Sequence, residues 1–302
     1  MAPSDLQPCT VASAVTDAAE RLRSAGSPTP RLDAELLVSH LFDRERTWLH
    51  AHPEVALSDD DVTALDGWIA RRSGGEPIAY IRGYKEWLSM RVATDRRALI
   101  PRPETELLAE AAIAEIAARL VRDDAPIVAW DVATGSGAVA LALALRFRTA
   151  LKLGRLQLVA SDLSPDALEL ASENLAAHGV SGLVSLAGGD LLEPVSDLAV
   201  VPDVLTANLP YVRSDEVDRA EGSHAFEPRT ALDGGPDGLD VVRRLVAQLP
   251  DRLAADGVAL LEVGAGQAEA THAAVESLPM RAVVSIHPDL AGIDRVVRVA
   301  RL

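Results

Sequence analysis

The stretch Ile127-Val-Ala-Trp-Asp131-Val-Ala-Thr-Gly135-Ser-Gly137-Ala-Val-Ala140 decides the fold of this chain. An apolar run leads into a glycine-containing turn and then into a run of alanine and valine, which predicts a buried strand, a tight turn and a helix. Glycines in such a turn let the backbone approach a ligand, and the N-terminus of the helix presents unpaired N–H groups to it. A tight turn without a ligand is the plainer interpretation, but the surrounding strand and helix favour a binding site.

Helices and strands continue to alternate around this stretch. We predict helices at residues 104–122, 138–148, 166–178 and 239–254, and strands at residues 126–131, 157–162, 184–187, 204–208, 257–263, 281–287 and 294–301. Such alternation is typical of a parallel sheet with helices on both faces. The last two strands are joined by a short connection, so we expect them to pair antiparallel. The predicted fold is α/β and Rossmann-like, with a mostly parallel seven-stranded sheet.

The beginning of the chain has a different pattern. Up to residue 73, apolar residues recur every three or four positions, which predicts a small all-α N-terminal domain. In one of these helices Asp33 and Glu35 flank the apolar stripe. Ser58, followed by three aspartates, is typical of a helix N-cap.

A connecting segment follows the helices. Gly74-Gly75 breaks the last helix, and the stretch Tyr80–Ile100 contains short β-like pieces that predict one hairpin. We therefore divide the chain into a helical domain at 1–73, an interdomain segment at 74–103 and an α/β domain at 104–302.

Composition excludes several classes of protein. The chain has 302 residues, with 29 Lys and Arg against 45 Asp and Glu, so its formal net charge of −16 argues against broad non-specific binding of nucleic acid. Cys9 is the single cysteine, so neither an intrachain disulfide nor a cysteine-based zinc site is expected, and we predict no metal. The first residues lack the pattern of a secretion signal, and no apolar run is long enough for a membrane span. We expect a cytoplasmic protein.

Two aspartates at strand ends indicate the kind of ligand. Asp131 precedes the glycine turn, where a carboxylate would repel the pyrophosphate of a dinucleotide but attract the ammonium group of S-adenosylmethionine (SAM). Asp162 ends the next predicted strand, where it can accept hydrogen bonds from ribose hydroxyls of either ligand. Because Ser164 and Pro165 already form a good helix start, Asp162 is free of the capping role and available for a ligand.

Two further strand ends carry polar side chains. In Gly188-Gly189-Asp190-Leu191, the carboxylate can bind an adenine amino group and Leu191 can pack on the ring, although a turn aspartate is an equally good interpretation. In Thr206-Ala-Asn208-Leu209-Pro210-Tyr211, the Asn208 amide oxygen and a nearby backbone carbonyl can accept both N–H bonds of a planar nitrogen. The latter pattern suits methylation of an amide or an exocyclic amine, while a proline-containing turn without a role is the alternative.

Together these features resemble the class I SAM-dependent methyltransferases that act on amino groups, whose motif is Asn-Pro-Pro-Tyr. Further blocks resemble one family, the HemK-type peptide chain release factor glutamine N5-methyltransferases. These blocks cover nearly the whole chain, and they begin at Pro30-Arg31, Gly75-Glu76-Pro77, Leu99-Ile100-Pro101-Arg102-Pro103-Glu104-Thr105-Glu106, Glu227-Pro228, Glu262-Val-Gly264 and Asp289-Leu. The Ile-Pro-Arg-Pro-Glu-Thr-Glu block is quite specific to the family.

The resemblance implies N5-methylation of the glutamine in the Gly-Gly-Gln motif of release factors, with SAM converted to S-adenosyl-L-homocysteine. It implies a monomer whose helical domain docks the protein substrate, with no membrane and no direct nucleic-acid partner. The implied cofactor-binding residues are Asp131, Ala133, Thr134, Gly135, Ser136, Gly137, Asp162, Asp190, Leu191 and Asn208. The implied catalytic residues are Asn208, Leu209, Pro210 and Tyr211, and the implied substrate-binding residues are Arg102, Glu104 and Glu106.

Two positions depart from the family. Leu209 replaces the first proline of the motif, and Asn-Leu-Pro-Tyr resembles the variant of the rRNA adenine N6-dimethyltransferases. Ala133 replaces a position that is usually glycine. An N6-adenine methyltransferase or another protein amine or amide methyltransferase is therefore the alternative. An NAD-dependent oxidoreductase is disfavoured by Asp131, and a cofactor-binding protein without catalysis would require that Leu209 spoils the alignment of the acceptor.

Overall fold

A computed structural model describes residues 8–122, 125–193, 200–220 and 222–302. The start of the predicted helical domain, residues 1–7, and three short stretches of the predicted α/β domain lie outside the described residues. The chain forms two compact units, Met1–Gly83 with Glu221–Phe226, and Tyr84–Ala220 with Glu227–Leu302. The chain passes from one unit to the other at Gly83, inside the segment 74–103 that was predicted to connect the domains.

The first unit is helical. Its helices are α1 (Val11–Ser24), α2 (Pro30–Leu41), α3 (Arg46–Ala51), α4 (Asp59–Ser73) and α5 (Ile78–Arg82), with a short 3-10 turn at Gly222–Phe226. Ser58 is the N-cap of α4, as predicted: its hydroxyl accepts from the Asp61 N–H at 3.2 Å, and the Asp61 carboxylate accepts from the Ser58 N–H at 2.9 Å. This reciprocal pair satisfies N–H groups that a helix start otherwise leaves unbonded.

The placement of Asp33 and Glu35 on the flanks of α2 was wrong, because both side chains are buried. Asp33 accepts hydrogen bonds from Ser27, Thr29 and, at 2.7 Å, the Nε of Arg72. Glu35 is paired with two arginines, Arg31 and Arg46. A buried carboxylate is tolerated when its charge is paired and its oxygens are hydrogen-bonded, and these cationic partners supply both.

The prediction of β-like pieces from Tyr80 onward was wrong at its beginning. Ile78–Arg82 forms the helical turn α5, in which Ile81 is buried in the apolar core of the first unit and Ile78 packs against that core. The hairpin follows it, with β1 (Tyr84–Trp87) and β2 (Met90–Ala93) paired antiparallel. Leu88 and Ser89 at its turn have φ values of 43° and 60°, the conformation that two-residue hairpins require.

The second unit contains the predicted seven-stranded sheet, in the order β5-β4-β3-β6-β7-β9-β8. Its strands are β3 (Ile127–Val132), β4 (Leu156–Asp162), β5 (Val184–Gly188), β6 (Val204–Asn208), β7 (Val258–Glu262), β8 (Ala282–Pro288) and β9 (Asp294–Arg301). The first five run parallel, and β9 pairs antiparallel with both β7 and β8, which confirms the expectation for the last two strands.

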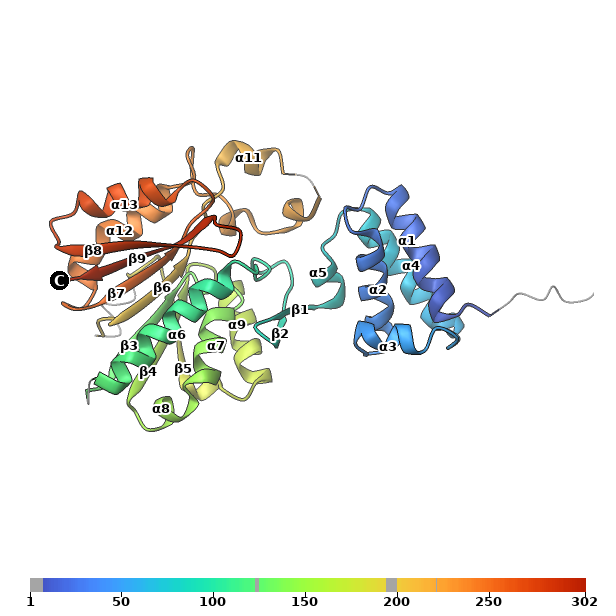
Figure 1. Ribbon diagram of the computed structural model, residues 1–302, viewed down its shortest axis with the longest axis horizontal. Helices are drawn as coiled ribbons and strands as arrows, with labels where there is room; N and C mark the ends of the chain where they lie inside the picture. Colours follow the sequence, from blue (N-terminus) through green and yellow to red (C-terminus); the bar gives the residue numbers. More distant parts are fainter. Residues whose placement is uncertain (1–7, 123–124, 194–199, 221) are drawn as a thin grey trace, which may run out of the picture. The chain divides into compact units, whose positions relative to one another are not determined.

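Helices cover both faces of the sheet, with α6, α7 and α9 on one face and α12 and α13 on the other (Figure 1). They are α6 (Thr105–Arg122), α7 (Ala138–Arg146), α8 (Arg148–Lys152), α9 (Pro165–Ala177), α11 (Ser214–Asp218), α12 (Asp240–Arg252) and α13 (Ala268–Glu276). The helix predicted at 138–148 is divided at Phe147, and α13 had not been predicted.

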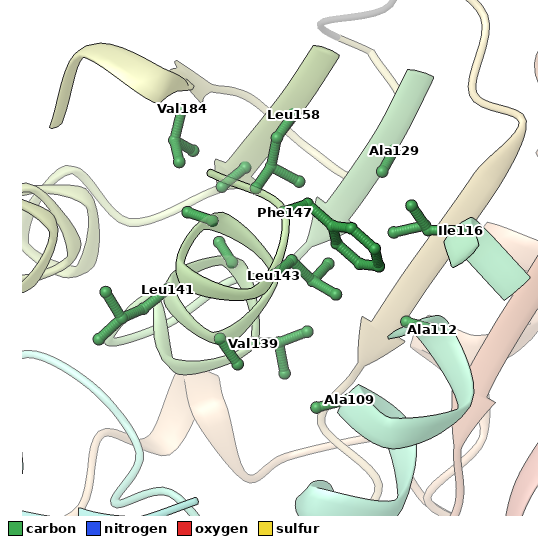
Figure 2. Close-up of a cluster of buried hydrophobic side chains, with 14 of the residues drawn as sticks. Ala109, Ala112, Ile116, Ala129, Val139, Leu141, Leu143, Phe147, Leu158 and Val184 are labelled. Carbon is green, nitrogen blue, oxygen red and sulfur yellow. The ribbon is translucent and has the colours of Figure 1, made fainter. Parts of the chain in front are cut away.

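Two apolar cores lie on the two faces of the sheet. Successive residues of β3 point alternately into them, Ala129 into the core beside α6 and α7, and Trp130 into the core beside α12. Figure 2 shows the first core, where Leu143 and Phe147 lie among side chains of α6 and the sheet. Burial on both faces explains why these strands are continuous apolar runs in the sequence. No helix in the described part of the chain is long and apolar enough to cross a membrane.

The strand order determines where a ligand can bind. From β3 the chain continues outward to β4 and β5, and it then returns to β6 on the other side of β3. The connections after β3 and β6 therefore leave the sheet in opposite directions and open a crevice at their carboxyl ends. Asp131 near the end of β3 and Asn208 at the end of β6 stand at this crevice.

Candidate active site

A cavity of about 430 Å³ lies at the carboxyl ends of the strands of the second unit. This volume is in the range of small-molecule sites. Much of its lining comes from the ends of four strands and the turns after them, at residues 133–136, 162–164, 189–191 and 208–210. Further lining residues come from other parts of the same unit, among them Leu99, Pro101, Thr105, Ala231 and Arg244. The cavity therefore brings together most of the predicted cofactor-binding residues, which are separated in sequence.

The glycine turn after β3 has the backbone shape expected of a ligand loop. Gly135 and Gly137 have φ values of 55° and 77°, in the left-handed region that favours glycine. A Cβ on Gly137 would also lie 2.9 Å from the Cβ of Ala171, so the loop packs directly on α9. Thr134, Gly135 and Ser136 line the cavity, whereas Gly137 supports the loop from behind.

Ala133 has a φ of 53°, which explains why glycine is usual at this position. An L-residue in this conformation costs about 1–2 kcal/mol, offset in part by the smaller entropy of its unfolded chain. The Ala133→Gly variant is therefore expected to raise the free energy of unfolding by about 0.5–1 kcal/mol. Denaturant unfolding of both proteins measures this difference, and an unchanged or lower free energy would contradict the expectation.

Asp131 is fully buried at the wall of the cavity. Its two carboxylate oxygens accept hydrogen bonds from Thr134 at 2.6 Å and from Thr206 at 2.8 Å. Burial raises the pKa of Asp131 to about 6, and the two hydroxyls oppose this shift because they stabilise the charge. The two hydrogen bonds hold the carboxylate in place, where its charge can stabilise a cationic group in the cavity.

Asp162 lines the cavity at the end of β4 and, as predicted, leaves the capping of α9 to Ser164. Its carboxylate is nevertheless hydrogen-bonded to two backbone N–H groups. One oxygen accepts from the Ser164 N–H at 2.9 Å, and the other from the Gly135 N–H at 2.8 Å. The hydroxyl of Ser164 caps α9 as predicted. Each carboxylate oxygen keeps a second lone pair for a ligand, so Asp162 links the glycine turn to β4 and still offers acceptors.

Asp190 and Leu191 lie beyond β5, and both line the cavity. Asp190 is ion-paired with Arg244 of α12, which also lines the cavity. Leu191 is buried, with a φ of 52°, so its side chain forms an apolar wall beside the charged pair. Four aspartates line the cavity, and three of them, Asp131, Asp162 and Asp190, follow the predicted strand ends. These three fit a cationic ligand that also carries hydroxyl groups and an apolar ring.

Asn208 is tied to α6. Its side-chain Nδ2 donates to the hydroxyl of Thr105 at 3.0 Å, and both residues line the cavity. Leu209 is buried in the core beside α12, while Leu209 and Pro210 also contribute to the cavity wall. Thr105 belongs to the block that resembles the family, but no role had been predicted for it, because it lies 103 residues from Asn208 and only the folded chain brings them together.

Tyr211 does not line this cavity. Its carbonyl accepts from the side chain of Gln267 at 2.9 Å, and Gln267 also accepts from the Gly264 N–H. Burial and the nearby carboxyl of Glu262 raise the pKa of Tyr211 to about 12, so the phenol stays protonated at neutral pH. Glu262 is a second residue that sequence reasoning left without a role, although its place at the end of an apolar strand was a usable signal.

The predicted substrate-binding residues Arg102, Glu104 and Glu106 do not line the cavity either. Arg102 pairs with the buried Glu227 at 2.5 Å, and Glu104 lies 3.9 Å from Arg295. Glu106 accepts from the Leu88 N–H at 3.2 Å and so holds the hairpin turn. Leu99, Pro101 and Thr105 of the same segment do reach the cavity. Among the described residues, no group of three or more His, Cys, Asp or Glu could hold a metal ion.

Known proteins resemble this chain both in its N-terminal part and over nearly its whole length. Residues 13–83 match the model of the PrmC N-terminal domain. The release factor glutamine methyltransferase of Koribacter versatilis is 37% identical over 289 residues, which cover 95% of this chain and 97% of that protein. The protein of the same name from Deinococcus radiodurans is 37% identical over 288 residues, with the same coverage of both chains.

Solved structures agree in fold. The catalytic domain of hMettl16, in complex with MAT2A 3′UTR hairpin 6, has a TM-score of 0.53 and 11% identity, and the match covers 80% of this chain and 82% of that one. This likeness concerns the fold alone. The full-length similarity to the bacterial proteins establishes that this chain belongs to the release factor glutamine methyltransferase family.

Proposed function

We propose that this protein transfers the methyl group of SAM to the side-chain nitrogen of glutamine in the Gly-Gly-Gln motif of peptide chain release factors. The observation that carries the proposal is the position of Asn208 at the end of β6. Its amide nitrogen donates to Thr105, and it lies at a cavity that aspartates of β3, β4 and the turn after β5 also line. The relatives that match nearly the whole chain bear this activity in their name.

The cavity residues fit SAM by their chemistry. We assign Asp131 to the ammonium group, Asp162 to the ribose hydroxyls, and Asp190 with Leu191 to the adenine ring, and all four residues line the cavity. The turn residues Ala133, Thr134, Gly135 and Ser136 line the same space, and Gly137 supports them. When bound, SAM supplies an electrophilic methyl group on a positively charged sulfur, and S-adenosyl-L-homocysteine is the product.

The work left to the protein is mainly orientation. An amide nitrogen is a weak nucleophile, because its lone pair is delocalised into the carbonyl. Acceptors on both N–H bonds align that nitrogen and stabilise the positive charge that develops on it. We assign the Asn208 side-chain oxygen and the Leu209 carbonyl to this role. Pro210 lines the cavity. We expect the neutral ring of Tyr211, which does not line the cavity, to pack on the amide once the substrate is bound.

The protein substrate requires a second region. We place its acceptor side near Arg102, Glu104 and Glu106, because neighbouring residues of that segment reach the cavity. The helical domain at 1–73 would dock the release factor, and segment 74–103 would connect it to the methyltransferase domain. We expect a monomer that acts in the cytoplasm, where release factors act, and we expect neither a membrane nor a direct nucleic-acid partner.

A labelled methyl-transfer assay tests the function. The full chain and SAM are incubated with a release factor in one reaction and with ribosomal RNA in another, and mass spectrometry locates the label. Label on the glutamine of Gly-Gly-Gln is the expected result. Label on adenine would favour the second candidate, an N6-adenine methyltransferase, which the Asn208-Leu209-Pro210-Tyr211 sequence suggests. Label on neither would contradict both.

The Leu209→Pro variant is expected to keep or raise the rate of methyl transfer. Proline retains the backbone carbonyl that we assign to the acceptor, and its fixed φ removes backbone freedom at that position. Steady-state kinetics of both proteins with the same release factor measure the effect. An inactive variant that still binds SAM would indicate a different geometry of the acceptor.

The affinity for SAM is expected to fall as pH decreases from about 7 to about 5. Burial raises the pKa of Asp131 to about 6, and protonation below that value removes the charge that attracts an ammonium group. One pH unit below the pKa the loss approaches about 10-fold if the protonated form does not bind. Calorimetry at several pH values measures it. Asp131→Asn should reduce the dependence to the part that comes from Asp162, whose pKa burial also raises and which the variant retains. A flat profile for the wild type would contradict the assignment.

A further inference from the structure

Glu262 is a buried carboxyl that ends β7 and is 1% exposed. In the part of the chain that the structure describes, no group forms a hydrogen bond of good geometry with either of its oxygens. The other buried carboxylates of the described residues have partners: Asp33, Glu35 and Glu227 each contact an arginine, and Asp131 accepts from two threonine hydroxyls. Because an unpaired buried carboxyl is costly, its position calls for a functional explanation.

Its neighbours are the residues of the proposed acceptor site. In the register of the parallel strands, Glu262 lies beside Asn208. The hydroxyls of Thr105 and Tyr211 are close enough to lower its pKa, as is the charge of Arg295, whereas burial and the charge of Glu104 raise it. Burial dominates, and the pKa of Glu262 is about 7. Arg295 itself pairs with Asp289 at 3.1 Å, so it does not neutralise Glu262 directly.

The donor and acceptor roles of the Thr105 hydroxyl connect Glu262 to Asn208. The Thr105 hydroxyl accepts from the Nδ2 of Asn208, and it has a single hydrogen of its own to donate. An ionised carboxylate only accepts, so Glu262 attracts that hydrogen and keeps the lone pair of Thr105 toward Asn208. The nitrogen end of the Asn208 amide then faces Thr105, and the oxygen end is left for the acceptor.

We propose that Glu262 is a positioning residue that acts through Thr105 to set which end of the Asn208 amide faces the substrate, and that it does so only when ionised. This inference rests on the proposed role of Asn208. Glu262 does not line the cavity, so it acts on the substrate through its neighbours and not by contact.

The Glu262→Gln variant keeps the shape of the side chain and replaces one acceptor oxygen with an NH₂ group that donates. Its amide can donate to Thr105, which frees the Thr105 hydrogen to bond the Asn208 oxygen and turn the amide around. We expect kcat to fall about 10–100-fold, with the Kd for SAM and the KM for the release factor within about threefold. Glu269→Gln, on the exposed face of α13, is the matched control and should match the wild type.

Three readouts separate positioning from a merely structural role. The wild-type kcat should fall as pH decreases through about 7, and Glu262→Gln should lack this limb. Because ionised Glu262 is buried at a cost, the variant should unfold at an equal or higher temperature at pH 8, whereas loss of a structural contact would lower that temperature. Thr105→Ser should retain activity and Thr105→Val should lose it, and the Thr105→Val/Glu262→Gln double variant should be no worse than Thr105→Val.

A measurement without turnover separates this inference from the proposed function. The chain has two asparagines, Asn174 and Asn208, so the side-chain ¹⁵N resonance of Asn208 can be identified by substitution. It should shift in Glu262→Gln and Thr105→Val but not in Glu269→Gln. A shift in a protein that methylates no release factor would retain the positioning role and refute the function. The inference would be overturned if Glu262→Gln had the kcat of the wild type, the same decrease of kcat at low pH, and an unshifted ¹⁵N resonance of Asn208.

Discussion

The Asn208→Ala variant is expected to lose about 10²–10³-fold in kcat for methyl transfer while the Kd for SAM changes by less than about threefold. Alanine removes the side-chain oxygen that would align the acceptor nitrogen and stabilise its developing charge. It leaves Asp131 and Asp162 and their hydrogen bonds in place, because the contact of Asn208 within the protein is with Thr105.

Two measurements make this expectation specific. Calorimetry gives the affinity for SAM, and single-turnover kinetics with a release factor give the rate of transfer. Ser277→Ala, whose exposed hydroxyl bonds only the carbonyl of Ala274, serves as a control that should match the wild type in both. Retained turnover in Asn208→Ala would show that another group aligns the acceptor.

The Asp162→Ala variant is expected to weaken SAM binding by about 10²-fold. Hydrogen bonds from a ligand to a charged group contribute about 1.5–3 kcal/mol each, and the ribose would lose its acceptors. The same substitution also breaks the bonds to the N–H groups of Gly135 and Ser164, so the glycine turn loses its link to β4. Both effects act on the same ligand, which is why we expect a large loss.

Calorimetry on a matched pair of variants tests the role of Asp162. Asp166→Ala, on the exposed first turn of α9, removes a charge from the same segment and should leave the affinity unchanged. Asp162→Asn keeps one oxygen acceptor and should fall between Asp162→Ala and the wild type. Equal affinities in Asp162→Ala and the wild type would refute the role in binding ribose.

Local signals predicted elements well where the pattern was strong. The strand at Val204–Asn208 and the N-caps Ser58 and Ser164 were predicted at their observed positions. The stretch from Tyr80 to Arg82 was misinterpreted because Tyr80 and Ile81 favour strands, whereas packing against α2 and α4 selects a helical turn. The short alanine-containing helix α13 has a weak amphipathic pattern and escaped prediction.

By itself, the sequence determined which residues end the buried strands, and so it identified Asp131, Asp162 and Asn208 as neighbours at one edge of the sheet. That inference is local, because the carboxyl ends of parallel strands always lie together. Only the tertiary structure decided which side chains complete the site. Thr105 reaches Asn208 across 103 residues, and Glu262 lies beside it because β6 and β7 pair in register. No local pattern encodes such contacts, since they arise from the order of strands in the sheet and from the helix that packs on it.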